Sequence, residues 1–372
     1  MKCFLHILTI LLTAGCALNA HAVSVSMDAK SWTVDDSQAA TGGTFEEHLG
    51  RPSIHLQRGI AMLNGVSIQN GSVEADVMPS HPGSGFVGLA FRMQSTKKYE
   101  LIYIRNGLGK QPNAVQYDPV FRGSITWQMH PGLQADAEIP QDRWNHLKIV
   151  FKGPRAELYV DHADKPLLVV NNLEQGDSRG SIGVWSLADG GYVSNVEYTQ
   201  TPDAPYVAQP QAFAADALND WSLSPGFRAQ EVKPTDYPQL KQLTWEKVAT
   251  DPPGILMIDR YRDSPDIFVP DRKLMEGDGL PIAAVVFAKT VIHSDADLRR
   301  QLVFGYSDEI VMYLNGQPIF TGKNGLGYRE SGAFGRLGMT ESVYLPLKRG
   351  DNELVFAIKE YSGGWGFQTA LK

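Results

Sequence analysis

The chain has 372 residues, with 34 Lys and Arg against 41 Asp and Glu, and two cysteines that both lie near the N-terminus. This length suffices for two ordinary domains. The formal charge of −7 argues against nucleic acid or an anionic membrane surface as the partner, because both attract an excess of positive charge.

The first 22 residues are typical of a cleaved secretory signal peptide. Lys2 precedes an apolar run over residues 4–17, and residues 20–22 (Ala-His-Ala) form an A-x-A cleavage pattern. The apolar run is too short for a permanent transmembrane helix, which needs about 20 residues. We therefore expect cleavage after Ala22 and a periplasmic or secreted protein.

An alternative fate is lipid modification of Cys16. Residues 13–16 (Thr-Ala-Gly-Cys) resemble the box that precedes the modified cysteine of bacterial lipoproteins, although Leu12 stands one place too early for it. The chain from Val23 on has no cysteine, so neither a disulfide nor a thiol contributes there. Removing residues 1–22 removes Lys2 alone among the charged side chains and takes the formal charge from −7 to −8.

Residues 23–200 read as a series of short strands separated by turns. Apolar and polar residues alternate over 71–77, 86–92, 99–105, 144–151 and 156–161, and further strands are expected at 180–185 and 193–198. Antiparallel sheets with one buried face produce this pattern. In order and spacing, these segments resemble the concanavalin A-like lectin/glucanase superfamily, especially its laminin-G-like members. The resemblance implies a two-sheet jelly roll, a fold in which many members bind sugars.

A Pro-rich linker is expected at residues 201–210, and a second domain at 211–372. Strands are expected at 299–306 and 310–314, followed by the hairpin pair Asn315-Gly316, which suits a tight turn. Through residues 308–316, 350–354 and 363–367 this domain resembles a galactose-binding-like jelly roll. The sequence therefore predicts an all-β protein with two β-sandwich (jelly-roll) domains in series.

Common catalytic motifs are absent from the sequence. It has no Gly-x-Ser-x-Gly, no His-Glu-x-x-His and no phosphate-binding glycine loop, and nothing has zinc-ligand spacing. The glucanase members of the resembled superfamily carry three carboxylates on one strand, as Glu-x-Asp-x-x-Glu or Glu-x-Asp-x-Glu, and the nearest equivalent here is Glu74 with Asp76. These two are weak catalytic candidates, because Met78 and Pro79 occupy the place of the third carboxylate. A solvated outer strand face is the alternative interpretation.

Aromatic and cationic residues at strand spacing are the best positive signal. If Ile102 and Ile104 face the core, Tyr103 and Arg105 face the opposite side. Sugars stack on aromatic rings and accept hydrogen bonds from arginine. The candidate ligand-binding residues on this basis are Arg92, Tyr99, Tyr103, Arg105, Tyr117 and Trp127, with the alternative that they belong to the core.

Trp365 is a further candidate, because the glycines around it allow a sharp bend that leaves the ring exposed. A core tryptophan is the alternative. No organic cofactor is expected. Both resembled families often hold calcium, and the oxygen-rich pairs Asp295/Asp297 and Asp308/Glu309 are its candidate ligands, although calcium needs six to eight oxygens.

Two functions remain open at the level of sequence. The first is an exported, lectin-like protein that binds a carbohydrate partner without turnover. The second is a glycan-active enzyme, a glycoside hydrolase or polysaccharide lyase, with its site in the first sandwich or at the domain junction. Two carboxylates at short range in a cleft would favour hydrolysis.

Overall fold

The computed structural model describes residues 21–35, 43–83, 85–106, 111–202, 211–240, 242–263, 283–325 and 335–372. Of the predicted signal peptide only His21 and Ala22 are among them, and Cys16 and residues 203–210 of the predicted linker lie outside them. No helix in the described ranges is long and apolar enough to cross a membrane.

Residues 22–200 form two antiparallel sheets, as the predicted all-β class requires. The eight-stranded sheet has the order β15 (Leu168–Val170), β14 (Arg155–Val160), β13 (Asn145–Lys152), β6 (Gly71–Pro79), β17 (Gly191–Gln200), β4 (Arg51–Leu56) and β3 (Thr44–His48), with β1 (Ala22–Ser24) paired to β17. The nine-stranded sheet has the order β11 (Ser124–Ile125), β10 (Val120–Phe121), β8 (Lys98–Arg105), β7 (Phe86–Ser95), β16 (Ser181–Leu187), β5 (Gly59–Leu63) and β2 (Trp32–Asp35). Strand β9 (Val115–Tyr117) pairs with β8 and with β12 (Gln134–Ala135).

The core of this first sandwich follows from strand alternation. On β6, Val73, Ala75 and Val77 are fully buried and share one hydrophobic cluster with Val87 and Leu89 of β7. The intervening residues of β6 point to the outer face of the eight-stranded sheet. The sequence pattern thus decides which β6 side chains reach solvent.

Residues 220–371 form a second pair of antiparallel sheets. The larger has the order β20 (Glu246–Ala249), β18 (Asp220–Leu223), β22 (Ala284–Ser294), β27 (Gly350–Glu360), β24 (Glu309–Leu314) and β25 (Gln317–Lys323), with β19 (Phe227–Arg228) beside β22. The smaller has the order β21 (Ile255–Met257), β28 (Gly366–Leu371), β23 (Leu298–Tyr306) and β26 (Glu341–Leu347). Short 3-10 turns are η1 (Trp127–Met129), η2 (Pro234–Gln239) and η3 (Ile258–Arg260).

The predicted Asn-Gly hairpin joins β24 to β25. Asn315 and Gly316 have φ of 51° and 77°, the left-handed values that a two-residue turn of this kind needs at both positions. The second sandwich has its own core cluster, separate from that of the first. The described chain therefore contains two β-sandwiches, as expected from the sequence.

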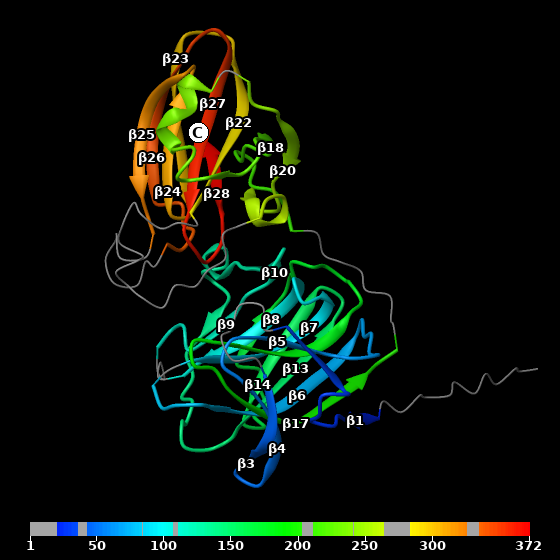
Figure 1. The fold of residues 1–372 in the computed structure, drawn as a ribbon. Helices are drawn as coiled ribbons and strands as arrows, with labels where there is room; N and C mark the ends of the chain where they lie inside the picture. Colours follow the sequence, from blue (N-terminus) through cyan, green and yellow to red (C-terminus); the bar gives the residue numbers. More distant parts are fainter. Residues whose placement is uncertain are drawn as a thin grey trace, which may run out of the picture.

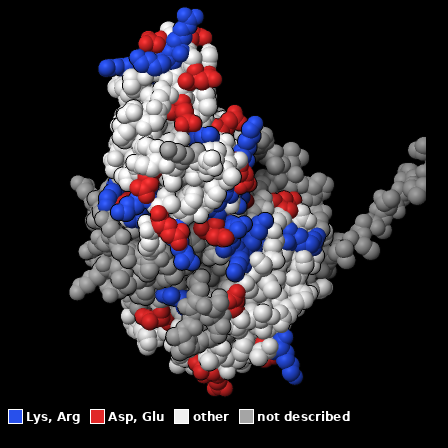
Figure 2. Space-filling view, turned by 45° about the horizontal axis from the view of Figure 1, so that its top comes forward, with Lys and Arg blue, Asp and Glu red and all other residues white. Residues whose placement is uncertain are grey.

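The two sandwiches contact each other through one end of each (Figure 1). Phe121 and Met129 of the first pack with Met257 and Leu337 of the second in a small buried cluster. Gln128 of the first sandwich adds two backbone hydrogen bonds to the second, because its N–H donates to the carbonyl of Gly363 (2.8 Å) and its carbonyl accepts from the N–H of Leu337 (2.8 Å). On the face shown in Figure 2, basic and acidic side chains lie interspersed.

Candidate functional site

The side chains of β8 point to the two faces of the sheet that the sequence predicted for them. Ile102 and Ile104 lie in the core of the first sandwich, whereas Tyr99 and Tyr103 belong to a second cluster on the opposite face of the sheet. Arg105 lies on that face too. The structure therefore brings together part of the predicted set on one side of the nine-stranded sheet.

Arg105 lies among three aromatic rings. Its guanidinium carbon is 5.6 Å from the ring centroid of Tyr103, 5.3 Å from that of Trp127 and 5.6 Å from that of Phe86. One terminal nitrogen donates to Gln116 Oε1 at 2.7 Å. Such contacts between a cation and aromatic rings stabilise the arrangement.

This aromatic group lies at the junction of the two sandwiches. Trp127 belongs to η1 rather than to a strand, and it directly precedes Gln128, which bonds the second sandwich. Tyr103 is only 3% exposed, and burial raises its pKa well above the ordinary value. Tyr99 is 4% exposed. The group is consequently engaged in packing, and Arg105 and Trp127 are its half-buried members.

Arg92 does not lie with Tyr103 and Arg105, contrary to expectation. Its side chain is fully buried and donates to the carbonyls of Gln69 (2.8 and 3.0 Å), Gly153 (2.6 Å) and Gly176. Burial lowers its pKa from the usual value. The backbone of Arg92 has a left-handed φ of 51°, so its side chain does not follow the alternation of the other β7 residues. A sequence pattern of period two does not reveal such a local change.

Tyr117 and Trp365 are core residues. Tyr117 packs inside the first sandwich, where its hydroxyl donates to Glu100 Oε2 at 2.6 Å. Trp365 is 0% exposed within the core of the second sandwich, and its N–H on the backbone donates to Asp259 Oδ2 at 2.6 Å. The expected exposed ring is wrong for Trp365, because its glycine neighbours let the chain turn into the core.

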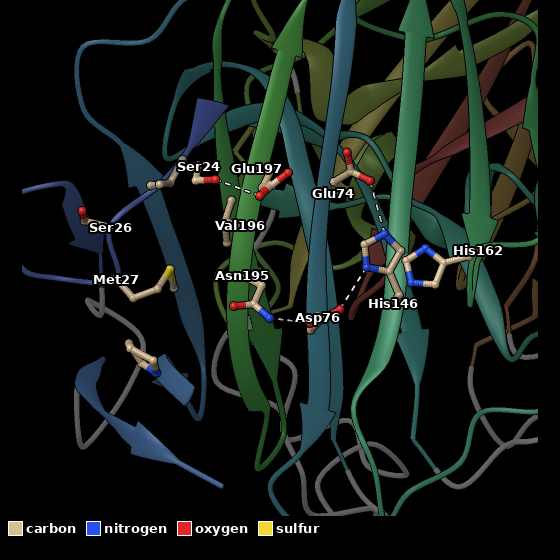
Figure 3. A pocket seen from close by; sticks show the side chains of 12 residues that line it. Ser24, Ser26, Met27, Glu74, Asp76, His146, His162, Asn195, Val196 and Glu197 are labelled. Atoms are coloured by element: carbon tan, nitrogen blue, oxygen red, sulfur yellow. Dashed lines mark hydrogen bonds and ion pairs between the residues drawn. The ribbon is translucent and has the colours of Figure 1, made fainter. Parts of the chain in front are cut away.

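The two weak catalytic candidates, Glu74 and Asp76, lie elsewhere, in the wall of an open pocket of about 670 Å³ (Figure 3). The pocket is on the outer face of the eight-stranded sheet. It is lined by Ser24, Val25, Ser26, Met27, Pro52, Glu74, Asp76, His146, His162, Asn195, Val196 and Glu197.

Strand register gathers the polar side chains of this pocket. Asp76 of β6 is opposite His146 of β13, and Glu74 is opposite Glu197 of β17. An irregularity in β17 puts Asn195 at φ of 50°, a conformation that asparagine tolerates better than most residues. The side chain of Asn195 is thereby aimed at Asp76, to whose Oδ2 its amide donates at 2.8 Å.

His146 joins the two carboxylates of β6. Its Nδ1 lies 2.9 Å from Asp76 Oδ1, and its Nε2 lies 3.3 Å from Glu74 Oε2. The ring of His162 stacks on that of His146 at a centroid distance of 4.0 Å. The imidazole of His146 therefore bridges the two acids, with one ring nitrogen beside each of them.

Two cations approach these carboxylates from outside the lining. Lys148 Nζ lies 3.2 Å from Glu74, and Arg51 donates to Asp76 Oδ2 at 2.6 Å. Glu197 accepts a hydrogen bond from Ser24 Oγ at 2.7 Å. Carboxylate, amide and hydroxyl groups beside the apolar Val25, Met27, Pro52 and Val196 suit a ligand with many hydroxyls and an apolar face.

Sequence reasoning found Glu74 and Asp76 but missed their partners. His146 and Lys148 alternate on a strand that was recognised, so the hairpin of 144–151 with 156–161 already placed them on the face away from Leu147 and Ile149. Glu197 and Asn195 carried no such signal, because the pairing of β17 with β6 joins segments far apart in the chain.

No group of three or more His, Cys, Asp or Glu among the described residues is arranged to hold a metal ion. Of the calcium candidates, Asp297 accepts from the backbone of Arg349 (2.8 Å) and Asp308 from that of Tyr361 (2.6 Å). Glu309 accepts from the hydroxyl of Tyr361 at 2.7 Å. Calcium binding by this protein stays a prediction.

No family model and no curated protein matches the sequence. Similar solved structures include the carbohydrate-binding module CBM66 from Bacillus subtilis, with 18% identity over 46% of this chain and 96% of that chain and a TM-score of 0.35. The exoplasmic/lumenal domain of VIP36, in a form bound to Ca²⁺ and Man3GlcNAc, shares 10% identity over 48% of this chain and 86% of its own, with a TM-score of 0.34.

A β-glucanase from Bacillus licheniformis is similar to the same degree, with 11% identity over 49% of this chain and 98% of that chain and a TM-score of 0.33. Another of the similar structures, from Bacillus subtilis, is described as having a galectin-like fold. At these identities and TM-scores, the likeness carries no function over to this chain.

Proposed function

We propose that this protein is exported and binds carbohydrate, without turnover, in the pocket on the outer face of its first sandwich. The observation that carries the proposal is the pocket itself, in which hydrogen-bonding side chains converge beside apolar ones. A sugar offers hydroxyl groups to the carboxylates of Glu74, Asp76 and Glu197, and its C–H face to Val25 and Met27.

The pocket is held ready for a ligand. The carboxylate of Asp76 is held by side-chain contacts with Arg51, Asn195 and His146. Fixed polar groups lose little conformational freedom on binding, so more of their interaction energy appears as affinity. The signal peptide predicted from the sequence and the resemblances in sequence to sugar-binding jelly rolls support the same proposal.

A glycan array followed by calorimetric titration of the purified protein tests this function. Replacing the exposed Ser26 by Trp fills the pocket, and we expect the affinity for any array ligand to fall at least tenfold. Ser95→Trp, an equal change at the exposed end of β7 outside the pocket, should leave affinity unchanged. An array without ligands, or equal affinity in both variants, would refute the proposal.

A glycoside hydrolase is the second candidate, and the register favours it in one respect. Glu74 and Glu197 are directly opposite on neighbouring strands, where Cβ atoms lie about 4.5–5.5 Å apart, although the carboxylate of Glu74 contacts Lys148 and that of Glu197 contacts Ser24. Retaining glycosidases hold their two carboxyl groups about 5 Å apart. If the parent protein releases reducing ends from array ligands and Glu197→Gln does not, the function is hydrolysis in place of binding alone.

The junction residues predicted from the sequence remain a separate proposal for sugar contact. Arg105 and Trp127 are half-buried, so they are the members of that group able to meet a ligand. Arg105→Ala tests this second contact in the same titration. A lower affinity in Arg105→Ala, with Ser26→Trp still blocking binding, would support a sugar contact at the junction. An unchanged affinity in Arg105→Ala would rule that contact out.

A further inference from the structure

One wall of the pocket comes from the N-terminal part of the chain. We call it the N-terminal wall, and it consists of the lining residues Ser24, Val25, Ser26 and Met27. Figure 3 shows Ser24, Ser26 and Met27 on one side of β17, with Glu74 and Asp76 of β6 on its other side. A ligand that fills the pocket therefore contacts both the N-terminal wall and the sheet.

The N-terminal wall is attached to the sheet along a single edge. β1 pairs with β17, and no other described strand pairs with β1. The N–H of Val25 donates to the carbonyl of Val196 at 2.9 Å. The hydroxyl of Ser24 donates to Glu197 Oε1 at 2.7 Å. These bonds to β17 position the wall against the rest of the lining.

The same wall contributes little to the core of the first sandwich. Ser24 and Ser26 are exposed, whereas Val25 and Met27 are half-buried against the edge of the core. The indole N–H of the buried Trp32 donates to the carbonyl of Ser26 at 3.0 Å. Segments with few buried apolar contacts open locally at low free energy, without global unfolding. If this wall opens, the pocket loses one side and the sandwich keeps its core.

We propose that ligand binding in the pocket is coupled to docking of the N-terminal wall on β17. A ligand that contacts both the wall and the sheet binds the docked state more tightly, and by linkage it stabilises docking to the same extent. The inference rests on the proposed function, since it names how the same pocket is regulated. The cleavage site predicted after Ala22 lies directly before this segment, so the exported chain would begin with it.

Removal of residues 23–27 tests the role of the wall, with calorimetric titration of the oligosaccharide that gives the strongest array signal. The shortened chain begins at Asp28, whose carboxylate still accepts from the backbone N–H groups of Lys30 (2.9 Å) and Ser31 (3.0 Å). We expect affinity to fall at least tenfold, a common size for such coupling. Removal of Val23 alone is the matched control, because Val23 is exposed and lies outside the lining. Equal affinity in the parent and both shortened chains would overturn the inference.

Scanning calorimetry separates loss of the wall from loss of the fold. None of residues 23–27 is fully buried, so the chain that begins at Asp28 should still melt cooperatively and keep the circular dichroism of the parent. A shortened chain that no longer folds would overturn the inference, because the segment would then belong to the core and could not dock separately.

Hydrogen exchange measures the coupling in the intact protein. The amide of Val25 is bonded to the carbonyl of Val196, so its exchange reports opening of the wall. We expect a saturating amount of the same oligosaccharide to slow this exchange at least tenfold. The amide of Gln301, bonded to the carbonyl of Lys372 at 3.1 Å in the second sandwich, should exchange at an unchanged rate. Unchanged exchange at Val25 would overturn the inference even if the shortened chain binds weakly.

An engineered disulfide distinguishes a wall that completes the pocket from a lid that blocks it. Ser24 and Glu197 are directly opposite, and the Cα atoms of such pairs lie about 4.5–5.5 Å apart, within the range that a disulfide spans. The chain from Val23 on has no cysteine, so Ser24→Cys with Glu197→Cys can be compared in its oxidised and reduced forms. The oxidised form should bind at least as tightly as the reduced form. Weaker binding after oxidation would overturn the inference, because the ligand would then need the segment displaced.

The two proposals fail in different ways. Binding that Ser26→Trp blocks, but that removal of residues 23–27 leaves unchanged, would keep carbohydrate binding in the pocket and overturn the coupling. An empty glycan array would remove the proposed function and, with it, the inference.

Discussion

Arg92 shows at the scale of one residue how a charged side chain becomes structural. It is fully buried, and its nitrogens satisfy backbone carbonyls from three separate segments, at Gln69, Gly153 and Gly176. Asp177 is 3.4 Å away. A buried carbonyl without a partner costs about 1–3 kcal/mol, so the guanidinium holds these turns together around one edge of the sandwich.

Arg92→Leu should therefore lower the free energy of unfolding by about 3 kcal/mol or more, since several carbonyls lose their donor at once. Urea unfolding measures the change. The matched control is Arg299→Leu, because Arg299 is exposed and such surface changes stay within about 0.5 kcal/mol. Equal effects of both substitutions would contradict a structural role for Arg92. Pocket binding of the folded variant should remain as in the parent.

At the scale of elements, the β3–β4 hairpin is fastened to the sheet by stacked rings. The ring of Tyr192 lies between those of His48 (3.6 Å) and His55 (4.2 Å), with interplanar angles of 5° and 12°. The hairpin turn next to it, Leu49-Gly50, is exposed. Stacking of this kind is worth about 0.5–1.5 kcal/mol for each pair.

Tyr192→Ala should consequently let the hairpin open more often, without unfolding the sandwich. We expect cleavage next to Leu49 by a protease specific for apolar residues to become roughly tenfold faster, because local opening sets that rate. Mass spectrometry of the fragments identifies the site. Tyr192→Phe keeps the ring and should be cleaved like the parent, and a faster rate in both variants would argue against stacking as the cause.

The sequence supports predictions of elements better than predictions of how distant elements pair. Strand alternation placed Ile102 and Tyr103 on their correct faces, because side chains on a strand alternate strictly. It also marked Glu74 and Asp76 as outward. The pocket around them depends on β1, β6, β13 and β17 lying side by side in one register, and a period of two is the same in every register.

At the scale of the whole molecule, buried acids organise the surface by which the second sandwich meets the first. Three buried carboxylates, those of Asp308, Glu360 and Asp259, accept hydrogen bonds from the backbone N–H groups of Tyr361, Ser362, Gly364 and Trp365. The carbonyl of Gly363 in this loop accepts from Gln128 of the first sandwich. A change in the charge of these acids therefore reaches the junction directly.

Burial raises the pKa of Asp308 and of Glu360 above their ordinary values, and in Glu360 the neighbouring Asp308 adds to the effect. The folded protein then holds protons that the unfolded chain has already released. Stability from these groups is complete below about pH 4, the ordinary range of carboxyl groups, and is lost as pH rises through their raised pKa values. Glu100, whose pKa burial raises to about 7, contributes with the same sign.

The melting temperature of the parent protein should therefore fall between pH 6 and pH 8, and Asp308→Asn should reduce that slope. An amide at position 308 still accepts from Tyr361 and Ser362 and tolerates the φ of 59° found there. Its nitrogen can donate to Glu360, in place of the hydrogen bond that protonated Glu360 donates to Asp308. At pH 8 we expect the variant to melt at the higher temperature, by about 2–4 °C for each kcal/mol gained. Scanning calorimetry across this range decides the matter, with the exposed Asp220→Asn as control. If the melting temperatures of parent and variant fall with pH at the same slope, Asp308 is not the group whose ionisation loosens the junction. Part of the slope should remain in the variant, because Glu100 in the first sandwich still ionises. That part should disappear only when Glu100 is replaced as well.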